Sequence, residues 1–99
     1  MGRSARERPK RLAEKLLQIR LALGLSQNQM LTRLGLSDKL YRTAVSGYEL
    51  GTTEPPLLVL LKYSKIAGIH MEVLVDDELD LPGKLQSTRK PEMSKRETR

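Results

Sequence analysis

The chain has 99 residues and a formal net charge of +6, with no Cys, Trp or Phe and only three Tyr. This length suits a single domain, the absence of Cys excludes disulfides and thiolate chemistry, and the longest apolar run, 57–61, is far too short to span a membrane. A core of Leu, Ile, Val, Met and Ala favours helices over a sheet.

The positive charge lies at the two ends of the chain. Residues 1–11 carry five basic and one acidic side chain, residues 82–99 carry six and two, and residues 12–81 carry seven and nine, which gives +4, +4 and −2. We therefore expect a flexible basic arm over 1–9, one folded domain over 10–82 and a disordered basic tail over 83–99. The arm is either a solvated terminus or a segment that follows nucleic-acid phosphates. The first twenty residues have no apolar leader segment, which predicts a cytoplasmic protein.

Two helices are predicted in the first third of the chain. The first covers 10–23 and ends at Gly24; its inner face is formed by Leu12, Leu16, Ile19 and Leu23. Ser26 begins the second, and Gln29 three residues later completes a capping box. Its buried side chains are Met30, Leu31 and Leu34, and it ends at Gly35.

A third helix ends at Gly51, but its start is open. It begins either after Ser37, a suitable N-cap, or near Arg42. Its inner face is predicted to contain Leu40, Ala44, Val45 and Tyr48, while Arg42, Thr43, Ser46 and Gly47 lie on its other sides.

A fourth helix follows Pro55 and Pro56, which suit a first helical turn. Its predicted inner face is Leu57, Leu60, Leu61, Ser64 and Ala67; Gly68 ends it and a short helix covers 69–75. The acidic segment 76–80 is interpreted as a solvated helix end, with a cation site as the alternative. The apolar residues Leu57, Leu58, Leu60, Leu61, Ile69, Val73 and Val75 are candidates for a homodimer patch, unless they only form core.

The ordered set of residues resembles the Xre and phage-repressor (lambda-repressor-like) family of helix-turn-helix proteins. The resemblance spans about 60 residues and rests on Leu16, Ile19 and Arg20, then 24–27, Met30, 34–35, 45–46, 48–49, Gly51, Pro55, Leu57, Leu60, Ala67 and 73–74. It implies an all-α fold of five helices in one compact domain. In that family the second and third helices bind DNA, with the third in the major groove.

The resemblance also implies roles for single residues. Arg42, Thr43 and Ser46 match base-facing positions, and Arg20 and Glu49 match a structural ion pair. Phosphate contacts are expected from Gln27, Asn28, Gly47, Thr52 and Thr53. Gly47 either permits close approach to DNA or is only tolerated.

The segment between Gly35 and Glu49 is about four residues longer than is usual in the family, so Lys39 and Tyr41 join the candidate base-reading residues. Leu31 stands where the family usually has Ala. We hypothesise that it fills space created when Leu40 and Tyr41 reposition the third helix.

These features together predict a double-stranded DNA-binding regulator, a repressor acting as a homodimer on a palindromic operator. It would be bacterial or phage-encoded and nucleoid-associated, with no cofactor. The single histidine, His70, argues against a metal site and a catalytic triad. The alternative is an antitoxin-like or adaptor module whose C-terminal tail binds a protein partner. The −2 charge of residues 12–81 and Glu54, where relatives often have a basic residue, favour this alternative.

Overall fold

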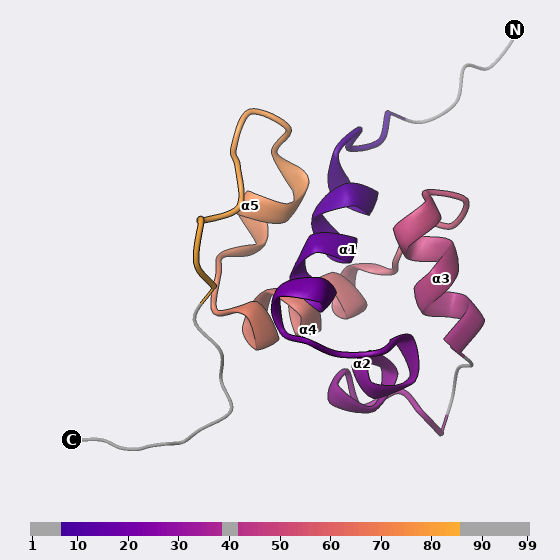
Figure 1. Ribbon diagram of the computed structural model, residues 1–99. Coiled ribbons are helices and arrows are strands. Elements are labelled where there is room, and N and C mark those ends of the chain that lie inside the picture. The colour runs from indigo at the N-terminus through magenta and orange to yellow at the C-terminus, as the bar shows by residue number, and fades with distance from the viewer. Residues whose placement is uncertain (1–6, 39–41, 86–99) are drawn as a thin grey trace, which may run out of the picture.

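The computed structural model describes residues 7–38 and 42–85, and these form five helices around one core (Figure 1). The helices are α1 (Leu12–Ala22), α2 (Gln27–Arg33), α3 (Arg42–Leu50), α4 (Leu57–Ala67) and α5 (Met71–Val75). No strand occurs in the described ranges. The predicted all-α, five-helix fold is therefore confirmed.

The core is aliphatic apart from two tyrosines. Its buried apolar side chains come from all five helices and are Leu12, Leu16, Ile19, Met30, Leu31, Leu34, Val45, Tyr48, Val59, Leu60, Tyr63, Ala67 and Leu74. Leu31 is buried as predicted, whereas Leu40 and Tyr41, which the hypothesis about its packing invokes, lie outside the described residues.

The capping box at the start of α2 is present as predicted. The Gln29 N–H donates to Ser26 Oγ at 3.0 Å, and the Ser26 N–H donates to Gln29 Oε1 at 2.8 Å. Gly35, with φ of 74°, then turns the chain out of α2 in the left-handed conformation that glycine adopts without strain. Ser37 lies in a turn and α3 begins at Arg42, so the later of the two predicted starts is the one observed.

The predicted inner face of α4 is partly wrong. Leu57 is 70% exposed and Leu61 is half-buried, while Val59 and Tyr63 are buried in their place. Residues 57–61 are all apolar, so their pattern does not indicate which side of the helix faces inward. Burial of Pro55 just before the helix and of Tyr63 within it sets the observed rotation.

The acidic segment after α5 holds the start of α1, which has no side-chain cap of its own. The Asp77 carboxylate accepts the N–H groups of Lys10 at 2.9 Å and Arg11 at 3.0 Å. Arg11 in turn pairs with Asp80 at 2.6 Å. The two backbone hydrogen bonds hold the pKa of Asp77 below its usual value. The interpretation of 76–80 as a solvated helix end was therefore incomplete.

Lys15 completes this contact from the side of α1. It is only 2% exposed, and its Nζ donates to the carbonyl oxygens of Val73 at 2.7 Å and Asp76 at 3.0 Å. These are carbonyls at the C-terminal end of α5, where a cation is favourable. Burial lowers the pKa of Lys15. We call Arg11, Lys15, Asp77 and Asp80 the α1–α5 clamp.

Candidate nucleic-acid interface

Helix α3 has a buried side and an open side. Val45 and Tyr48 are buried, whereas Arg42 and Thr43 are exposed and Ser46 is half-buried. The structure thus brings three of the five predicted base-reading residues together on the outer side of one helix, at the right of Figure 1. The other two, Lys39 and Tyr41, lie outside the described residues.

The loop after α3 folds back onto Gly47. The N–H groups of Thr52 and Thr53 both approach the Gly47 carbonyl oxygen, at 3.1 and 3.3 Å. A Cβ on Gly47 would lie 3.0 Å from Thr53 Oγ1, which is tighter than ordinary contact. The glycine therefore has an intramolecular role that was not predicted from the sequence: it leaves room for the threonines. We call Arg42, Thr43, Ser46, Gly47, Thr52 and Thr53 the α3 surface.

An ion pair fixes α3 to α1. Arg20 Nε lies 2.6 Å from Glu49 Oε2, and Nη2 donates to Oε1 at 3.0 Å. Nη1 donates to the Leu25 carbonyl at 2.9 Å. The side chains are only 14% and 4% exposed, so this bidentate pair is shielded from solvent. The hydrogen bond to Glu49 raises the pKa of Arg20.

Gln27, a predicted phosphate contact, joins the same network. Its Nε2 donates to Glu49 Oε1 at 3.2 Å, which the sequence did not indicate. Its neighbour Asn28 is exposed in the first turn of α2, and Thr52 and Thr53 are exposed beside α3. Of the predicted phosphate contacts, these three side chains are therefore accessible to a ligand, whereas Gln27 is half-buried and its amide is hydrogen-bonded to Glu49.

The buried Tyr63 hydroxyl has no hydrogen-bond partner in the described part of the chain. Burial raises its pKa, and the nearby Glu49 carboxylate raises it further. A buried hydroxyl without a partner costs about 1–3 kcal/mol. The pattern of α4 predicted neither the burial of Tyr63 nor its closeness to the ion pair.

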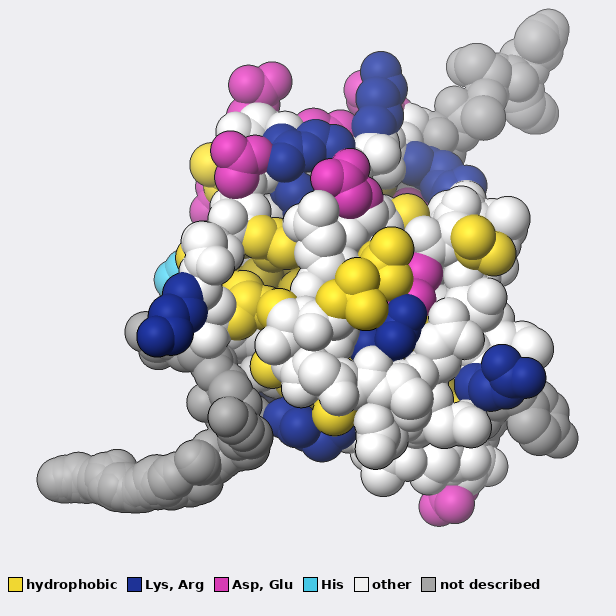
Figure 2. Space-filling model, viewed as in Figure 1, with side chains coloured by type: hydrophobic (Ala, Val, Ile, Leu, Met, Phe, Trp, Pro, Cys, Tyr) yellow, Lys and Arg dark blue, Asp and Glu magenta, His cyan; other side chains and the backbone are white. Residues whose placement is uncertain are grey.

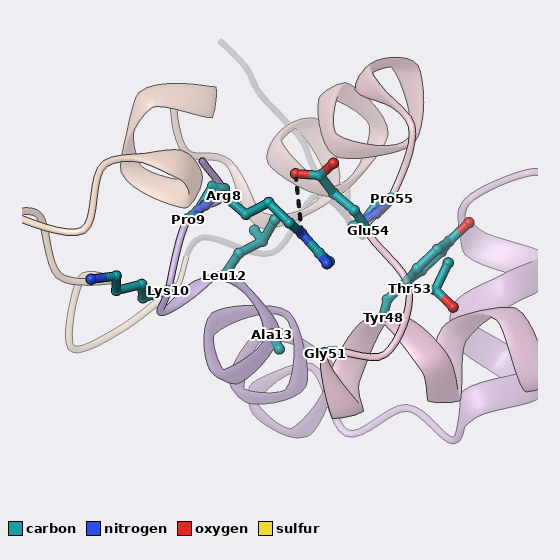
Figure 3. Close-up of a pocket in the computed structure, with 10 residues that line it drawn as sticks. All are labelled: Arg8, Pro9, Lys10, Leu12, Ala13, Tyr48, Gly51, Thr53, Glu54 and Pro55. Carbon is teal, nitrogen blue, oxygen red and sulfur yellow. Dashed lines mark ion pairs between the residues drawn. The ribbon is translucent and has the colours of Figure 1, made fainter. Parts of the chain in front are cut away.

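A pocket of about 240 Å³ opens where the segment before α1 meets the loop after α3 (Figure 3). Glu54, the residue that departs from the family pattern, lies at its edge and is half-buried. The Arg8 Nε is 3.8 Å from Glu54 Oε2. Glu54 therefore does not carry an isolated negative charge beside the α3 surface.

Charge is unevenly distributed over the molecule. On the face shown in Figure 2, acidic side chains gather with basic ones near α5 and the start of α1, and most of the surface over α2 and α3 carries no acidic group. The described residues contain no cluster of His, Cys, Asp and Glu suited to a metal ion, and none of the described helices is long and apolar enough to cross a membrane.

Only part of the predicted dimer patch is accessible. Leu57 and Leu58 are 70% and 68% exposed, and Val75 is also exposed. Leu60 is buried in the core, so its inclusion in the patch was wrong. The remaining members, Leu61, Ile69 and Val73, are half-buried.

Comparison with known protein families gives a match. A protein-family model described as helix-turn-helix matches residues 16–74, from Leu16 in α1 to Leu74 in α5. No curated protein and no solved structure matches the chain. The match covers more than half of the chain; it begins within α1, ends within α5 and includes the whole of α2, α3 and α4. The chain therefore belongs to the helix-turn-helix family of DNA-binding transcriptional regulators, of the Xre and lambda-repressor-like type.

Proposed function

We propose that this regulator is a sequence-specific repressor that reads a palindromic operator in the major groove through α3. The observation that carries this proposal is the α3 surface. Exposed Arg42 and Thr43 lie on the outer side of a helix whose inner side is fixed by Val45 and Tyr48. Rigid support of this kind is what base readout needs, because hydrogen bonds to base edges tolerate little displacement.

The chemistry of the α3 surface suits base edges and phosphates. Arg42 can bind guanine O6 and N7 with two hydrogen bonds, and Thr43 and Ser46 can donate, accept or contact a thymine methyl group. Lys39 and Tyr41, which precede α3, are proposed as further base contacts. Repression then follows from occupancy of the promoter and needs no covalent chemistry.

Phosphate contacts are proposed from the edges of the same surface. Asn28 and Gln27 are at the start of α2, and Thr52, Thr53 and the Gly47 backbone flank the end of α3. Contacts of this class set the register of the protein on the duplex but carry no sequence information. The Gln27–Glu49 hydrogen bond supports a fixed orientation of the Gln27 amide before DNA arrives.

A homodimer would place two copies of α3 in successive major grooves, about 34 Å apart along the duplex. Exposed Leu57 and Leu58, together with Val75, are the apolar residues we propose for contact with a second copy. An operator read this way is an imperfect palindrome, because the two-fold axis of the dimer coincides with that of the site.

Selection of bound sequences from random DNA tests the proposal. We expect enrichment of an imperfect palindrome whose half-site spacing fits one helical turn. Arg42→Ala should weaken operator binding by about 1–3 kcal/mol and relax the preference at one base pair. Lys65→Ala, which removes the same charge from an exposed position in the last turn of α4, should leave that preference unchanged. Equal losses on operator and random DNA would show that Arg42 contacts phosphate only.

A protein-interaction module of the antitoxin or adaptor kind is the second candidate. The −2 charge of residues 12–81 supports it. Glu54 supports it less than its sequence position suggests, because Arg8 lies beside it. Salt-dependent retardation of duplex DNA by the full chain favours the regulator, whereas the absence of any retardation at low salt favours the module.

A further inference from the structure

The segment before α1 crosses to the loop after α3, where Arg8 meets Glu54 (Figure 3). The 3.8 Å between Arg8 Nε and Glu54 Oε2 joins side chains that are 45% and 22% exposed. Solvent-accessible ion pairs of this kind contribute little to folding stability. The pair is therefore expected to contribute little to holding the domain together.

Both partners are held in place by their neighbours. The backbone of Lys10, two residues after Arg8, donates its N–H to the Asp77 carboxylate, and the intervening Pro9 has a restricted φ angle. Glu54 is followed directly by Pro55, which is buried. These contacts fix the backbone two residues after Arg8 and directly after Glu54.

The pair lies at the border of the α3 surface. Glu54 directly follows Thr53, whose hydroxyl fills the space left by Gly47. A carboxylate at this border repels a phosphate that approaches the threonines, because like charges within about a Debye length of 10 Å interact in dilute salt. Arg8 brings a compensating charge to the same place, and its guanidinium extends over the pocket lined by Ala13 and Gly51.

We propose that Arg8 is an intramolecular counterion for Glu54, which allows the loop after α3 to meet a DNA phosphate. The inference rests on the proposed function and deepens it: Arg8 is a positioning residue that reads no base. The family match includes Glu54 but begins at residue 16, so it does not account for Arg8. The α1–α5 clamp, which fixes the start of α1, holds Arg8 in range.

A double-mutant cycle on the full chain tests the proposal. Wild type, Arg8→Gln, Glu54→Gln and the double variant are titrated with a random-sequence duplex at several salt concentrations. We expect Arg8→Gln to weaken binding about fivefold at about 0.1 M salt, because it removes a positive charge that lies beside the Glu54 carboxylate. In the Glu54→Gln background the same change should cost less than about twofold, since no carboxylate remains to be neutralised. Thermal unfolding should be similar for all four proteins.

Two further variants serve as controls. Arg8→Lys keeps the charge and should bind nearly as well as wild type. Lys10→Gln removes an equal charge two residues away, where the side chain points away from Glu54 in Figure 3, and should show no coupling to Glu54→Gln. Equal losses from Arg8→Gln in both backgrounds, or no loss in either, would overturn the counterion role while leaving DNA binding intact. Absence of binding by the wild type would remove the proposed function and this inference together.

Discussion

Burial makes the Arg20–Glu49 ion pair important for stability, and substitution of either partner measures this. Arg20→Met leaves the Glu49 carboxylate, only 4% exposed, with the Gln27 amide at 3.2 Å as its remaining hydrogen-bond donor among the contacts described above. Removing one partner from a buried pair costs about 3–5 kcal/mol. Glu49→Gln should cost less, about 1–2 kcal/mol, because the Arg20 guanidinium keeps its bond to the Leu25 carbonyl.

These free energies correspond to large shifts in Tm. In a domain of this size each kcal/mol changes Tm by about 4–8 °C, so Arg20→Met should lower Tm by at least about 12 °C. Thermal and urea unfolding followed by far-UV circular dichroism provides the measurement. The double variant Arg20→Met/Glu49→Met should lose less stability than the sum of the single changes, because no unpaired charge is left inside. Small, additive losses in all three variants would refute the reasoning.

A second ion pair in the same protein is the matched control. Arg11 Nη2 and Asp80 Oδ1 are also 2.6 Å apart, but these side chains are 38% and 80% exposed. Solvent screening weakens such a pair, so Asp80→Asn should leave Tm close to that of the wild type. If Asp80→Asn and Glu49→Gln lowered Tm equally, the strength of these ion pairs would depend on the distance between their charged atoms and not on their burial.

Three further predictions follow from single contacts. Replacing Gly by Ala inside a helix usually raises the free energy of unfolding by about 1 kcal/mol. Gly47→Ala should not give this increase, because the new Cβ meets Thr53 Oγ1 at 3.0 Å. In a Thr53→Gly background the same substitution should stabilise the domain, as judged by Tm. Tyr63→Phe removes the hydroxyl without a described partner and should raise the free energy of unfolding by about 1 kcal/mol. Because the folded-state pKa of Tyr63 lies above its usual value of 10.0, the unfolded chain loses that proton first. Wild-type stability should therefore fall above about pH 10, and less steeply in Tyr63→Phe. The pKa of Asp77 is held below its usual 3.8, so ionised Asp77 stabilises the folded state above that pH, and this stabilisation is lost as pH falls through the folded-state pKa. Asp77→Asn should therefore flatten the acid side of a plot of Tm against pH. An unchanged plot would contradict this.

Sequence alone was sufficient where the determining interactions are local. The capping box needs only Ser26 and Gln29, three residues apart, and Gly35 ends its helix through its own backbone freedom. The pairing of Arg20 with Glu49, 29 residues apart, came from family resemblance, since no local pattern joins them.

Sequence reasoning missed the contacts that join distant parts of the chain. Lys15 looks like an ordinary polar position on an amphipathic helix, and only the carbonyls at the end of α5, about 60 residues later, explain its burial. Asp77 caps a helix that begins 65 residues earlier in the chain. The rotation of α4 was ambiguous for a different reason, because five consecutive apolar residues satisfy every helical phase equally well.

The α1–α5 clamp has a consequence for the order of folding during synthesis. Of the five described helices, α1 leaves the ribosome first, but the carboxylate that caps it and the carbonyls that accept hydrogen bonds from Lys15 emerge only with residues 73–80. An isolated helix of 11 residues is marginal in water, and contacts between residues that are 58–66 positions apart form late because of the entropy of closing such long loops. Among the five described helices, α1 is thus synthesised first but is one of the last to become stable, and a nascent chain that stops near the end of the matched segment, at residue 74, leaves it uncapped.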